Sequence, residues 1–284
     1  MAAQNKRFLI VGGGKMGEGI LSGWLGSSSA PADEVECDVV EVVEPGAERR
    51  AYLTERYHVT CFADVAEVEH VPDVVVLSVK PQVMMNVLAG LAPLPAFQTT
   101  GDGPLFISIA AGLTTASLEA ALPHGAALVR VMPNMPLAIG AGASGVCGGA
   151  HASEEQVAYV ASLFDCLGKA VVVEESDMDA VCAVSGSGPA YVAAMVEALR
   201  DAGVAQGLDA ELAETLALQT VLVTARLIDE GDQSVADVRI SICSPGGTTL
   251  AALEAMEAAG FAHVFDEGVA AAVRRSKELA SCSR

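Results

Sequence analysis

A run of seven residues near the carboxyl end of the chain has the composition of an anion-binding turn at a helix start. Residues 243–249 read Cys-Ser-Pro-Gly-Gly-Thr-Thr, and good helix formers continue from 250 to 259. Proline is favoured in a first helical turn, and glycine lets a ligand approach the backbone. The N–H groups of the helix start and the hydroxyls of Ser244, Thr248 and Thr249 would then face a carboxylate. The alternative is an ordinary helix cap above a glycine turn.

A second motif, near the amino end, could hold the phosphates of a dinucleotide. The pattern GxGxxG occupies 12–17, between an apolar segment at 7–11 that predicts a strand and a segment at 18–25 that predicts a helix. In this context glycines permit a tight turn and let a pyrophosphate approach the helix start. The alternative is a purely structural glycine turn. The predicted cofactor-binding residues of this motif are Gly12, Gly14, Lys15, Met16 and Gly17.

The residue after the second predicted strand bears on the choice of cofactor. That strand covers 37–43 and is followed by Glu44. An acidic side chain at this point commonly accepts hydrogen bonds from the adenosine ribose and would repel the extra phosphate of NADP, which favours NADH. Arg49 and Arg50 lie one turn further on and could neutralise that phosphate. A solvated helix face is the other interpretation of this arginine pair.

Further apolar segments predict the rest of a sheet, at 74–79, 105–110, 128–132, near 145 and at 170–173. Their alternation with helical segments is typical of a doubly wound α/β domain, in which ligands bind at the carboxyl ends of the strands. We therefore expect the residues at these ends to border the cofactor. Lys80 could instead be a solvated lysine, and Asn134 could instead cap its own turn. The predicted residues are Ser78, Val79, Lys80, Pro81, Ala110, Ala111, Gly112 and Asn134.

The chain changes character after about residue 175, where strand signals end and helices cover most of 177–280. We predict a dinucleotide-binding domain at 1–175 and an all-α domain at 176–284. The segment 212–228 carries apolar residues around nearly its whole circumference, which is typical of a helix buried on every side. About a hundred residues give a thin core, so we expect these helices to interlock with a second chain. The alternative is a monomer whose helices pack on the first domain alone.

Composition excludes several other classes of protein. The net charge of −20 disfavours nucleic acid as a partner. The seven cysteines lack CxxC spacing, which is typical of reduced thiols in a cytoplasmic protein, and the five histidines lack metal-ligand spacing. The charge-free run at 131–153 could reach across a bilayer, but its prolines and glycines disfavour a membrane helix. We expect a cytoplasmic protein with no metal and no membrane span.

Six motifs, in order along the chain, carry a specific family resemblance. They are the GxGxxG at 12–17, Val79-Lys80-Pro81, Ala110-Ala111-Gly112, Met132-Pro133-Asn134, Ser-Gly-Ser-Gly-Pro-Ala-Tyr at 185–191 and Ser-Pro-Gly-Gly-Thr-Thr at 244–249. The fifth motif places two glycines and a proline inside an apolar helical run, which also marks a helix break or a close-packed crossing. With these motifs, from about residue 7 to about residue 280, the chain closely resembles the pyrroline-5-carboxylate reductases.

The resemblance implies an activity, an assembly and a set of site residues. Members reduce L-1-pyrroline-5-carboxylate to L-proline with NAD(P)H, and their helical domains intertwine into dimers that sometimes form decamers. The residues implied to bind substrate are Glu175, Ser244, Gly246, Gly247, Thr248 and Thr249. The Thr249 hydroxyl is implied to lie near the ring nitrogen, which makes it the candidate catalytic residue. A protonated imine is already a good electrophile, so orientation and a hydrogen bond at the nitrogen are sufficient help.

The chain departs from the family pattern at two places. Glu44 and Gly46 stand where many members have Thr or Ser around the ribose phosphate, and Ile240 and Ser241 stand where members often have Asp followed by Met or Asn. Two other classes of protein fit less well. A β-hydroxyacid dehydrogenase usually relies on a lysine in its helical half, and none occurs between 169 and 277. A dinucleotide sensor would have no use for a second anion-binding turn at 244–249.

Overall fold

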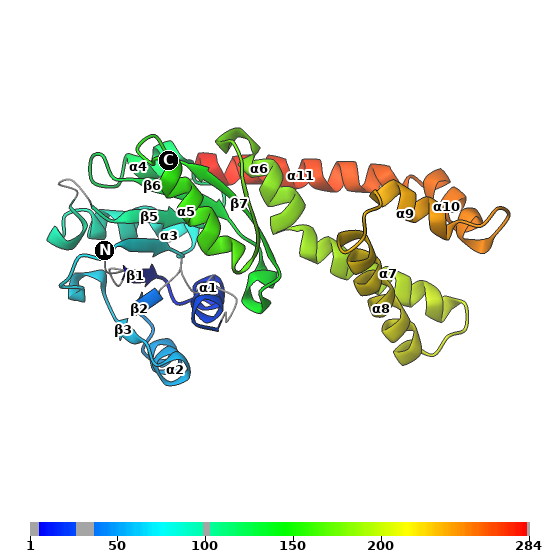
Figure 1. Ribbon diagram of the computed structural model, residues 1–284, viewed down its shortest axis with the longest axis horizontal. Coiled ribbons are helices and arrows are strands. Elements are labelled where there is room, and N and C mark those ends of the chain that lie inside the picture. The colour runs from blue at the N-terminus through cyan, green and yellow to red at the C-terminus, as the bar shows by residue number, and fades with distance from the viewer. Residues whose placement is uncertain (1–5, 27–36, 99–102, 283–284) are drawn as a thin grey trace. The chain divides into compact units, whose positions relative to one another are not determined.

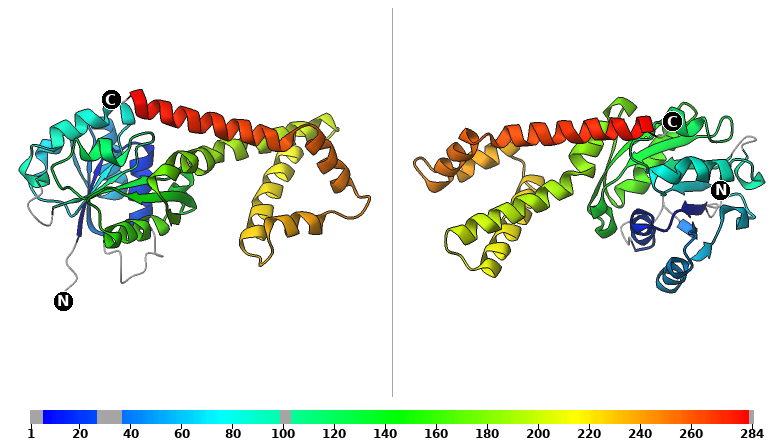
Figure 2. Two further views of the ribbon diagram at one scale, coloured as in Figure 1. Left: turned by 90° about the horizontal axis from the view of Figure 1, so that it is seen from above. Right: turned by 180° about the vertical axis from the view of Figure 1, so that it is seen from behind.

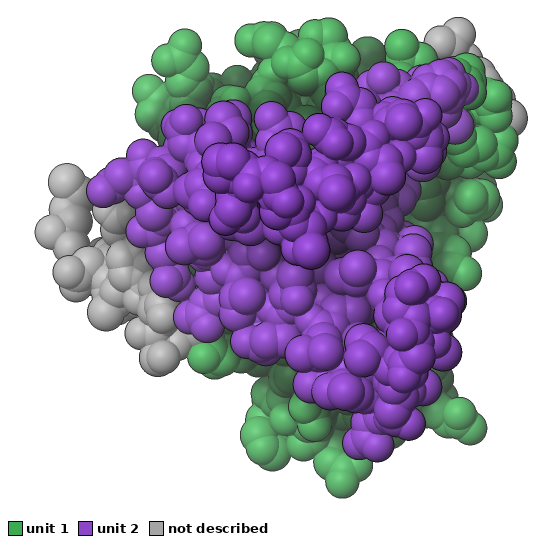
Figure 3. All heavy atoms as spheres, turned by 90° about the vertical axis from the view of Figure 1, so that its right-hand side faces the viewer, with its two compact units in different colours: residues 1–187, 272–284 green, residues 188–271 purple. Residues whose placement is uncertain are grey.

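The computed structural model describes residues 6–26, 37–98 and 103–282. The sequence also predicts a surface loop at 27–33, and this segment lies outside the described residues. Packing divides the chain into two compact units, residues 1–187 with 272–284, and residues 188–271 (Figure 3). The first unit thus continues past 175, because a short helix and a π turn that follow this residue pack with the sheet. The domain boundary at 175 stays a prediction.

One eight-stranded sheet forms the centre of the first unit (Figure 1). Its spatial order is β3-β2-β1-β4-β5-β6-β7-β8; the first six strands run parallel, β7 runs antiparallel to β6, and β8 runs parallel to β7. The chain order reverses between β1 and β4, where doubly wound sheets bind ligands. The strands are β1 (Lys6–Val11), β2 (Cys37–Val43), β3 (Thr60–Phe62), β4 (Val74–Leu77), β5 (Leu105–Ser108), β6 (Leu128–Met132), β7 (Gly142–Gly148) and β8 (Gly168–Val172).

The predicted doubly wound sheet is confirmed, with differences at several strand ends, such as β8, which covers 168–172 where 170–173 was predicted, and with one additional strand. β4 and β5 each end two residues earlier than predicted, at Leu77 and Ser108. β4 stops short because Pro81 begins the next helix, and the residue before a proline, Lys80, takes the extended conformation of a cap. The short strand β3 was not predicted, because three half-exposed residues are too few to show a periodicity.

Apolar side chains alternate between the two faces of the sheet and form two separate cores. One core receives Ile20, Trp24, Leu53 and Phe164 from α1, α2 and α5, and the other receives α3 and α4 (Figures 1 and 2). Trp24 packs its ring against Phe8 and Phe164 while its Nε1 donates to the Leu163 carbonyl at 2.9 Å. The helices are α1 (Lys15–Gly26), α2 (Ala47–Tyr57), α3 (Pro81–Leu91), α4 (Thr115–Glu119) and α5 (Glu154–Asp165).

The predicted helix break at 185–191 is confirmed as a π turn. The Ser187 N–H donates to the Cys182 carbonyl at 2.9 Å, one residue beyond ordinary α-helical spacing. Pro189 then sits in the first turn of the next helix, where its missing N–H costs nothing. The remaining helices are α6 (Met178–Val181), α7 (Gly188–Ala205), α8 (Ala210–Asp229), α9 (Val235–Ile242), α10 (Thr248–Ala258) and α11 (Phe261–Cys282).

The helix predicted at 212–228 exists as α8, but a single chain does not bury it on every side. Ala213 and Ala217 are 3% exposed, whereas six large apolar side chains of α8 are between 45% and 58% exposed. One chain therefore leaves this helix partly exposed, and its burial against a second chain stays a prediction. The six residues, named the α8 apolar surface below, are Leu212, Leu216, Leu218, Leu222, Val223 and Leu227.

Candidate functional site

The glycine turn between β1 and α1 is shaped by close packing behind it and open space in front. Gly12 has φ +109°, and a Cβ on it would lie 2.9 Å from the Ser78 carbonyl oxygen. A Cβ on Gly17 would lie 2.1 Å from the Gly12 carbonyl oxygen. A Cβ on Gly14 would meet no atom within 4 Å. The first and third glycines are thus required by the fold, while Gly14 leaves the turn open to a phosphate, so these residues fit a dinucleotide.

Ser78, at the end of β4, fixes the position of this turn. Its Oγ lies 2.7 Å from the Gly12 carbonyl oxygen and 3.1 Å from the Val11 carbonyl oxygen. The structure therefore occupies its hydroxyl with the turn itself. Lys80 is exposed at the cap of α3, beside Val79 and Pro81, on the carboxyl side of β4.

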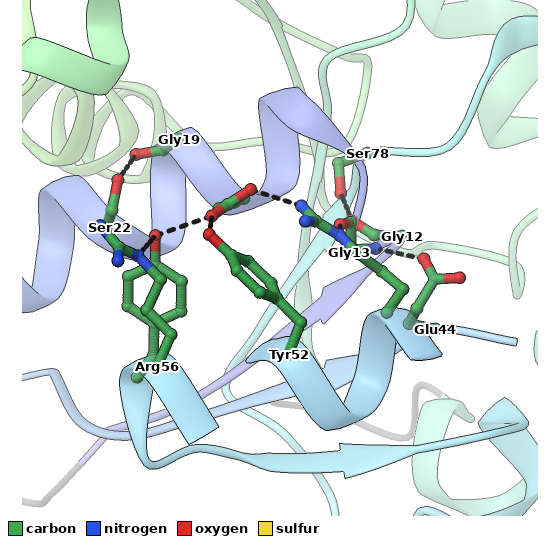
Figure 4. Close-up of polar contacts among 11 residues, drawn as sticks. Gly12, Gly13, Gly19, Ser22, Glu44, Tyr52, Arg56 and Ser78 are labelled. Atoms are coloured by element: carbon green, nitrogen blue, oxygen red, sulfur yellow. Dashed lines mark hydrogen bonds and ion pairs between the residues drawn. The ribbon is translucent and has the colours of Figure 1, made fainter. Parts of the chain in front are cut away.

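Glu44 holds the other side of the turn, at the end of β2. Its Oε2 accepts from the Gly13 N–H at 3.0 Å (Figure 4), and its Oε1 accepts from the Gly46 N–H at 2.9 Å. Arg50 Nη1 donates to the Glu44 and Pro45 carbonyl oxygens, each at 2.8 Å. The predicted ribose-binding carboxylate thus lies beside the glycine turn, and Arg50 is engaged with the backbone of the following bend.

Arg49 joins the glycine turn to α1 through contacts that the sequence did not reveal. Its Nε donates to the Gly13 carbonyl oxygen at 2.6 Å, and its Nη2 lies 2.5 Å from Glu18 Oε2. Glu18 Oε1 also accepts from the hydroxyls of Tyr52, at 3.0 Å, and Tyr57, at 2.9 Å. Sequence patterns gave no signal for this cluster, because it depends on how α1 and α2 lie against each other.

Asn134, after β6, connects three parts of the first unit. Its side chain is buried, with Nδ2 donating to the Ser185 carbonyl at 3.0 Å and Oδ1 accepting from the Ala143 N–H at 2.8 Å. The Asn134 side chain makes no hydrogen bond that caps its own turn, so the capping alternative is wrong; it holds the start of β7 and the π turn instead, and contact with the nicotinamide stays a prediction. After β5, Ala110 is buried and Gly112 has φ +78°, so the chain turns sharply at the carboxyl end of this strand, where the sequence predicts cofactor contacts.

Glu175 is held by the first unit through both carboxylate oxygens. Oε1 accepts from the Thr115 N–H at 2.6 Å and from Arg130 Nη1 at 3.3 Å, and Oε2 accepts from the Thr115 hydroxyl at 2.5 Å. The Arg130 side chain is only 4% exposed. The buried guanidinium thus has a carboxylate as its ion-pair partner, which offsets part of the cost of burying its charge. The sequence gave no signal for Arg130 and Thr115, because they lie 45 and 60 residues from Glu175 along the chain and only the fold brings the three side chains together.

Cys147 lies opposite Arg130 on β7 and illustrates the electrostatics of this region. Burial raises the pKa of its thiol to about 11, the charge of Glu175 adds to the rise, and Arg130 opposes it. Since the thiolate is the reactive form, we expect iodoacetamide at pH 8 to modify Cys147 at least ~10-fold more slowly in the native protein than in urea. Peptide mass spectrometry over a time course measures both rates, and equal rates would contradict the environment described for this thiol.

The anion-binding turn lies in the second unit and differs in one detail from the prediction. The Gly247 N–H donates to the Ser244 carbonyl at 2.9 Å and Gly246 has φ +68°, which is the pattern of a type II turn with proline at its second position. α10 begins only at Thr248. Pro245 therefore precedes the helix instead of opening it, because the tight turn needs its fixed φ.

The start of α10 presents donors in the way an anion requires. Gly247 is the N-cap and carries no side-chain acceptor, so no side chain of the described chain caps the first N–H groups of α10. Thr248 and Thr249 occupy the first two helical positions, and Thr249 is half-buried while Ser244 and Thr248 are exposed. These hydroxyls and N–H groups belong to one turn, which can hold a carboxylate.

The described residues form neither a metal-ligand cluster nor a membrane-spanning helix. Within 6–26, 37–98 and 103–282, no three His, Cys, Asp or Glu side chains gather in a way that could hold a metal ion. None of the helices in the described part of the chain is long and apolar enough to cross a membrane.

Comparison with known proteins gives matches to both halves of the chain. Residues 175–279 match the family model of pyrroline-5-carboxylate reductase dimerisation, and residues 7–112 match that of the coenzyme F420-dependent NADP oxidoreductases. Pyrroline-5-carboxylate reductase of Synechocystis is 42% identical over 95% of this chain and 97% of its own length. The enzyme of the same name from Mycobacterium tuberculosis is 38% identical over 96% of each chain.

Solved structures give the same result. Pyrroline-5-carboxylate reductase from Coxiella burnetii superposes with a TM-score of 0.87 at 33% identity, over 97% of this chain and 99% of the other. Pyrroline carboxylate reductase from Plasmodium falciparum, with NADP bound, superposes with a TM-score of 0.81 at 29% identity, over 98% of this chain and 100% of the other.

Proposed function

This chain belongs to the pyrroline-5-carboxylate reductase family, and from that premise we infer that it reduces the C=N bond of L-1-pyrroline-5-carboxylate with a hydride from NAD(P)H, giving L-proline. The reaction is the last step of proline biosynthesis. The observation that carries this proposal is the presence of two anion sites in one chain. A glycine turn at the switch point of the sheet fits a dinucleotide, and the uncapped start of α10 fits a small carboxylate.

The first unit would bind and orient NAD(P)H, which supplies the hydride. The glycine turn and the start of α1 would hold the pyrophosphate, and Glu44 would accept hydrogen bonds from the ribose. The residues after β4, β5 and β6 would border the rest of the dinucleotide. The proposed cofactor-binding residues are Gly12, Gly14, Lys15, Met16, Gly17, Glu44, Ser78, Val79, Lys80, Pro81, Ala110, Ala111, Gly112 and Asn134.

The turn at the start of α10 would hold the substrate. The backbone N–H groups of Gly246 and Thr248 and the hydroxyls of Ser244 and Thr248 would bind the carboxylate. Gly247, whose own N–H closes the turn onto the Ser244 carbonyl, would let the substrate approach the backbone. The imine carbon gains the hydride, and the nitrogen gains a lone pair as it becomes an amine. A hydroxyl that donates to this nitrogen therefore stabilises the transition state. We assign that role to Thr249. Glu175, which is paired with Arg130, would place a carboxylate beside a cationic imine.

We propose that NADH is the preferred cofactor, because the Glu44 carboxylate lies at the end of β2 where a 2′-phosphate would approach. Glu44→Gln removes this charge but keeps an oxygen acceptor for the Gly13 N–H. We expect the NADPH-to-NADH ratio of kcat/KM to rise about tenfold in this variant, which corresponds to roughly 1.4 kcal/mol. Initial rates with each cofactor measure the ratio, and an unchanged ratio would remove Glu44 from the proposal.

We also propose that the protein is a cytoplasmic homodimer, joined through its helical domain, which can assemble further into decamers. Within residues 188–271 the buried apolar side chains are Ala213, Ala217 and Val238, which is too little to form a core. The α8 apolar surface supports a second chain as the missing part of that core. The acidic net charge of −20 makes nucleic acid an unfavourable partner.

The direct test follows NADH and NADPH oxidation at 340 nm with pyrroline-5-carboxylate and the purified protein. We expect turnover that requires the substrate, together with stoichiometric L-proline detected by mass spectrometry. Binding of both dinucleotides with no oxidation would overturn the proposed activity and would leave the turn at α10 as a site for another carboxylate.

A further inference from the structure

A cation and an anion hold the same peptide of the glycine turn from opposite sides. Glu44 Oε2 accepts from the Gly13 N–H at 3.0 Å, and Arg49 Nε donates to the Gly13 carbonyl oxygen at 2.6 Å. Figure 4 shows Glu44 beside Gly13 and Gly12, with Ser78 behind the turn. In doubly wound sheets this place, next to the end of the second strand, borders the adenosine ribose. Both charges therefore lie where a ribose phosphate would be sensed.

The charge of Arg49 is already compensated by Glu18 on α1. The two side chains meet at 2.5 Å, and they are 31% and 20% exposed. Tyr52 and Tyr57, both on α2, donate to the second oxygen of Glu18, and Figure 4 shows Tyr52 directed from α2 toward α1. These three donors hold the carboxylate in one orientation, so the ion pair is geometrically defined on both sides.

Glu18 stays ionised in this cluster. Burial by itself raises the pKa of its carboxyl, but the hydrogen bonds from Arg49, Tyr57 and Tyr52 outweigh burial and hold the pKa below its ordinary value. At neutral pH the pair therefore consists of a carboxylate and a guanidinium, and Arg49 presents little net charge to a ligand. Arg50 is likewise engaged, by the Glu44 and Pro45 carbonyl oxygens.

An arginine with these neighbours would otherwise favour NADPH. A guanidinium binds phosphate strongly because its donors form a planar fork, and Arg49 follows Glu44 by only five residues. With Arg49 tied to Glu18 and the Arg50 guanidinium held on the Glu44 and Pro45 carbonyl oxygens, the Glu44 carboxylate forms no ion pair within the described part of the chain. The balance at this edge then disfavours a 2′-phosphate.

We propose that Glu18 is a specificity-determining residue that acts through Arg49: by pairing with the guanidinium, it withholds Arg49 from a 2′-phosphate and favours NADH over NADPH. This inference rests on the proposed use of a nicotinamide dinucleotide. Glu18 is a positioning residue here, with no contact to the reacting atoms.

The experiment compares NADPH and NADH binding in the wild-type protein and in Glu18→Gln, using nicotinamide fluorescence at constant ionic strength. Glutamine keeps an acceptor for the tyrosines but removes the charge that holds Arg49. We expect the NADPH Kd to fall about fivefold, the gain of a charge-assisted contact at a partly exposed site, while the NADH Kd changes less than about twofold. An unchanged ratio of the two Kd values would overturn the proposal.

Two further variants separate the pairing from a general structural effect. Glu18→Gln combined with Arg49→Met is expected to return the NADPH Kd to within about twofold of wild type, because no guanidinium is left to release. A gain that persists in this double variant contradicts the proposal. Tyr52→Phe is the matched control: it removes one hydrogen bond to Glu18 and leaves the ion pair, so the ratio should hold. If the ratio shifts as far in Tyr52→Phe as in Glu18→Gln, the shift does not require loss of the ion pair, and the proposal is contradicted.

A third outcome is available if Glu18→Gln does not fold. Arg49→Met alone is expected to weaken NADPH binding less than about twofold, since its charge is already compensated. A loss of tenfold or more would show that Arg49 binds the phosphate in the wild type, which overturns the proposal. Failure of wild-type protein to bind either dinucleotide would instead refute the proposed function, so the two failures are distinguishable.

Discussion

Replacing Thr249 with alanine is expected to lower kcat by about ten- to a hundredfold while the melting temperature stays nearly unchanged. Loss of one well-placed donor to a developing charge commonly costs at least this much in rate. Thr249 occupies the second position of α10 and is half-buried, and no side-chain hydrogen bond to the first turn depends on it. Its removal should therefore disturb folding by less than about 1 kcal/mol. Steady-state kinetics and thermal unfolding of the same samples measure both quantities.

Two neighbouring substitutions sharpen this prediction. Thr249→Ser keeps the hydroxyl and should restore most of kcat. Thr248→Ala removes the adjacent hydroxyl, which lies at the first helical position and is exposed. It should raise KM more than it lowers kcat, because we assign Thr248 to carboxylate binding and not to the nitrogen. A Thr249→Ala enzyme with wild-type kcat and KM would remove Thr249 from the catalytic assignment.

The parts of the site that could be predicted are those specified by local spacing. GxGxxG between a strand and a helix fixes a turn whose first and third glycines cannot carry a Cβ, and the structure shows why at Gly12 and Gly17. Glu44 follows β2 directly, so its position at the sheet edge follows from the strand alone. Apolar runs of four to seven residues gave most strands for the same reason.

The parts that could not be predicted depend on which elements meet in space. Arg49 contacts Glu18 across 31 residues, and Arg130 contacts Glu175 across 45. Each pair is set by the packing of helices or strands, which spacing does not encode. Pro245 shows a smaller failure of the same kind: proline suits both a first helical turn and a type II turn, and the Gly247–Ser244 hydrogen bond decides between them.

The helical half shows a pattern whose explanation lies outside a single chain. The apolar circumference of α8 predicted burial, but one chain buries Ala213 and Ala217 and leaves the leucines exposed. Apolar area of this extent on neighbouring residues is typical of an interface. This exposure fits the expectation from the sequence that the helices interlock with a second chain, and burial of α8 in a dimer stays a prediction.

Leu218→Asp combined with Leu222→Asp is expected to abolish stable association of the helical domain. The two residues lie four apart on the α8 apolar surface and are 58% and 51% exposed in one chain. Aspartate at these positions therefore removes little packing within the same chain. In a dimer the same positions would place unpaired carboxylates in an apolar contact, which costs several kcal/mol. We expect dissociation at micromolar concentration in sedimentation equilibrium.

Loss of the partner should also unfold the helical half, because residues 188–271 bury so few large side chains of their own. We therefore expect the urea midpoint to depend on protein concentration in the wild type and to fall sharply in the double variant, together with turnover. Gln206→Asp combined with Gln233→Asp is the matched control, since it adds the same two charges at exposed polar positions outside α8. A double variant that sediments as wild type and keeps its urea midpoint would mean that this face of α8 stays in solvent, and the second chain would have to be sought against another surface of the helical half.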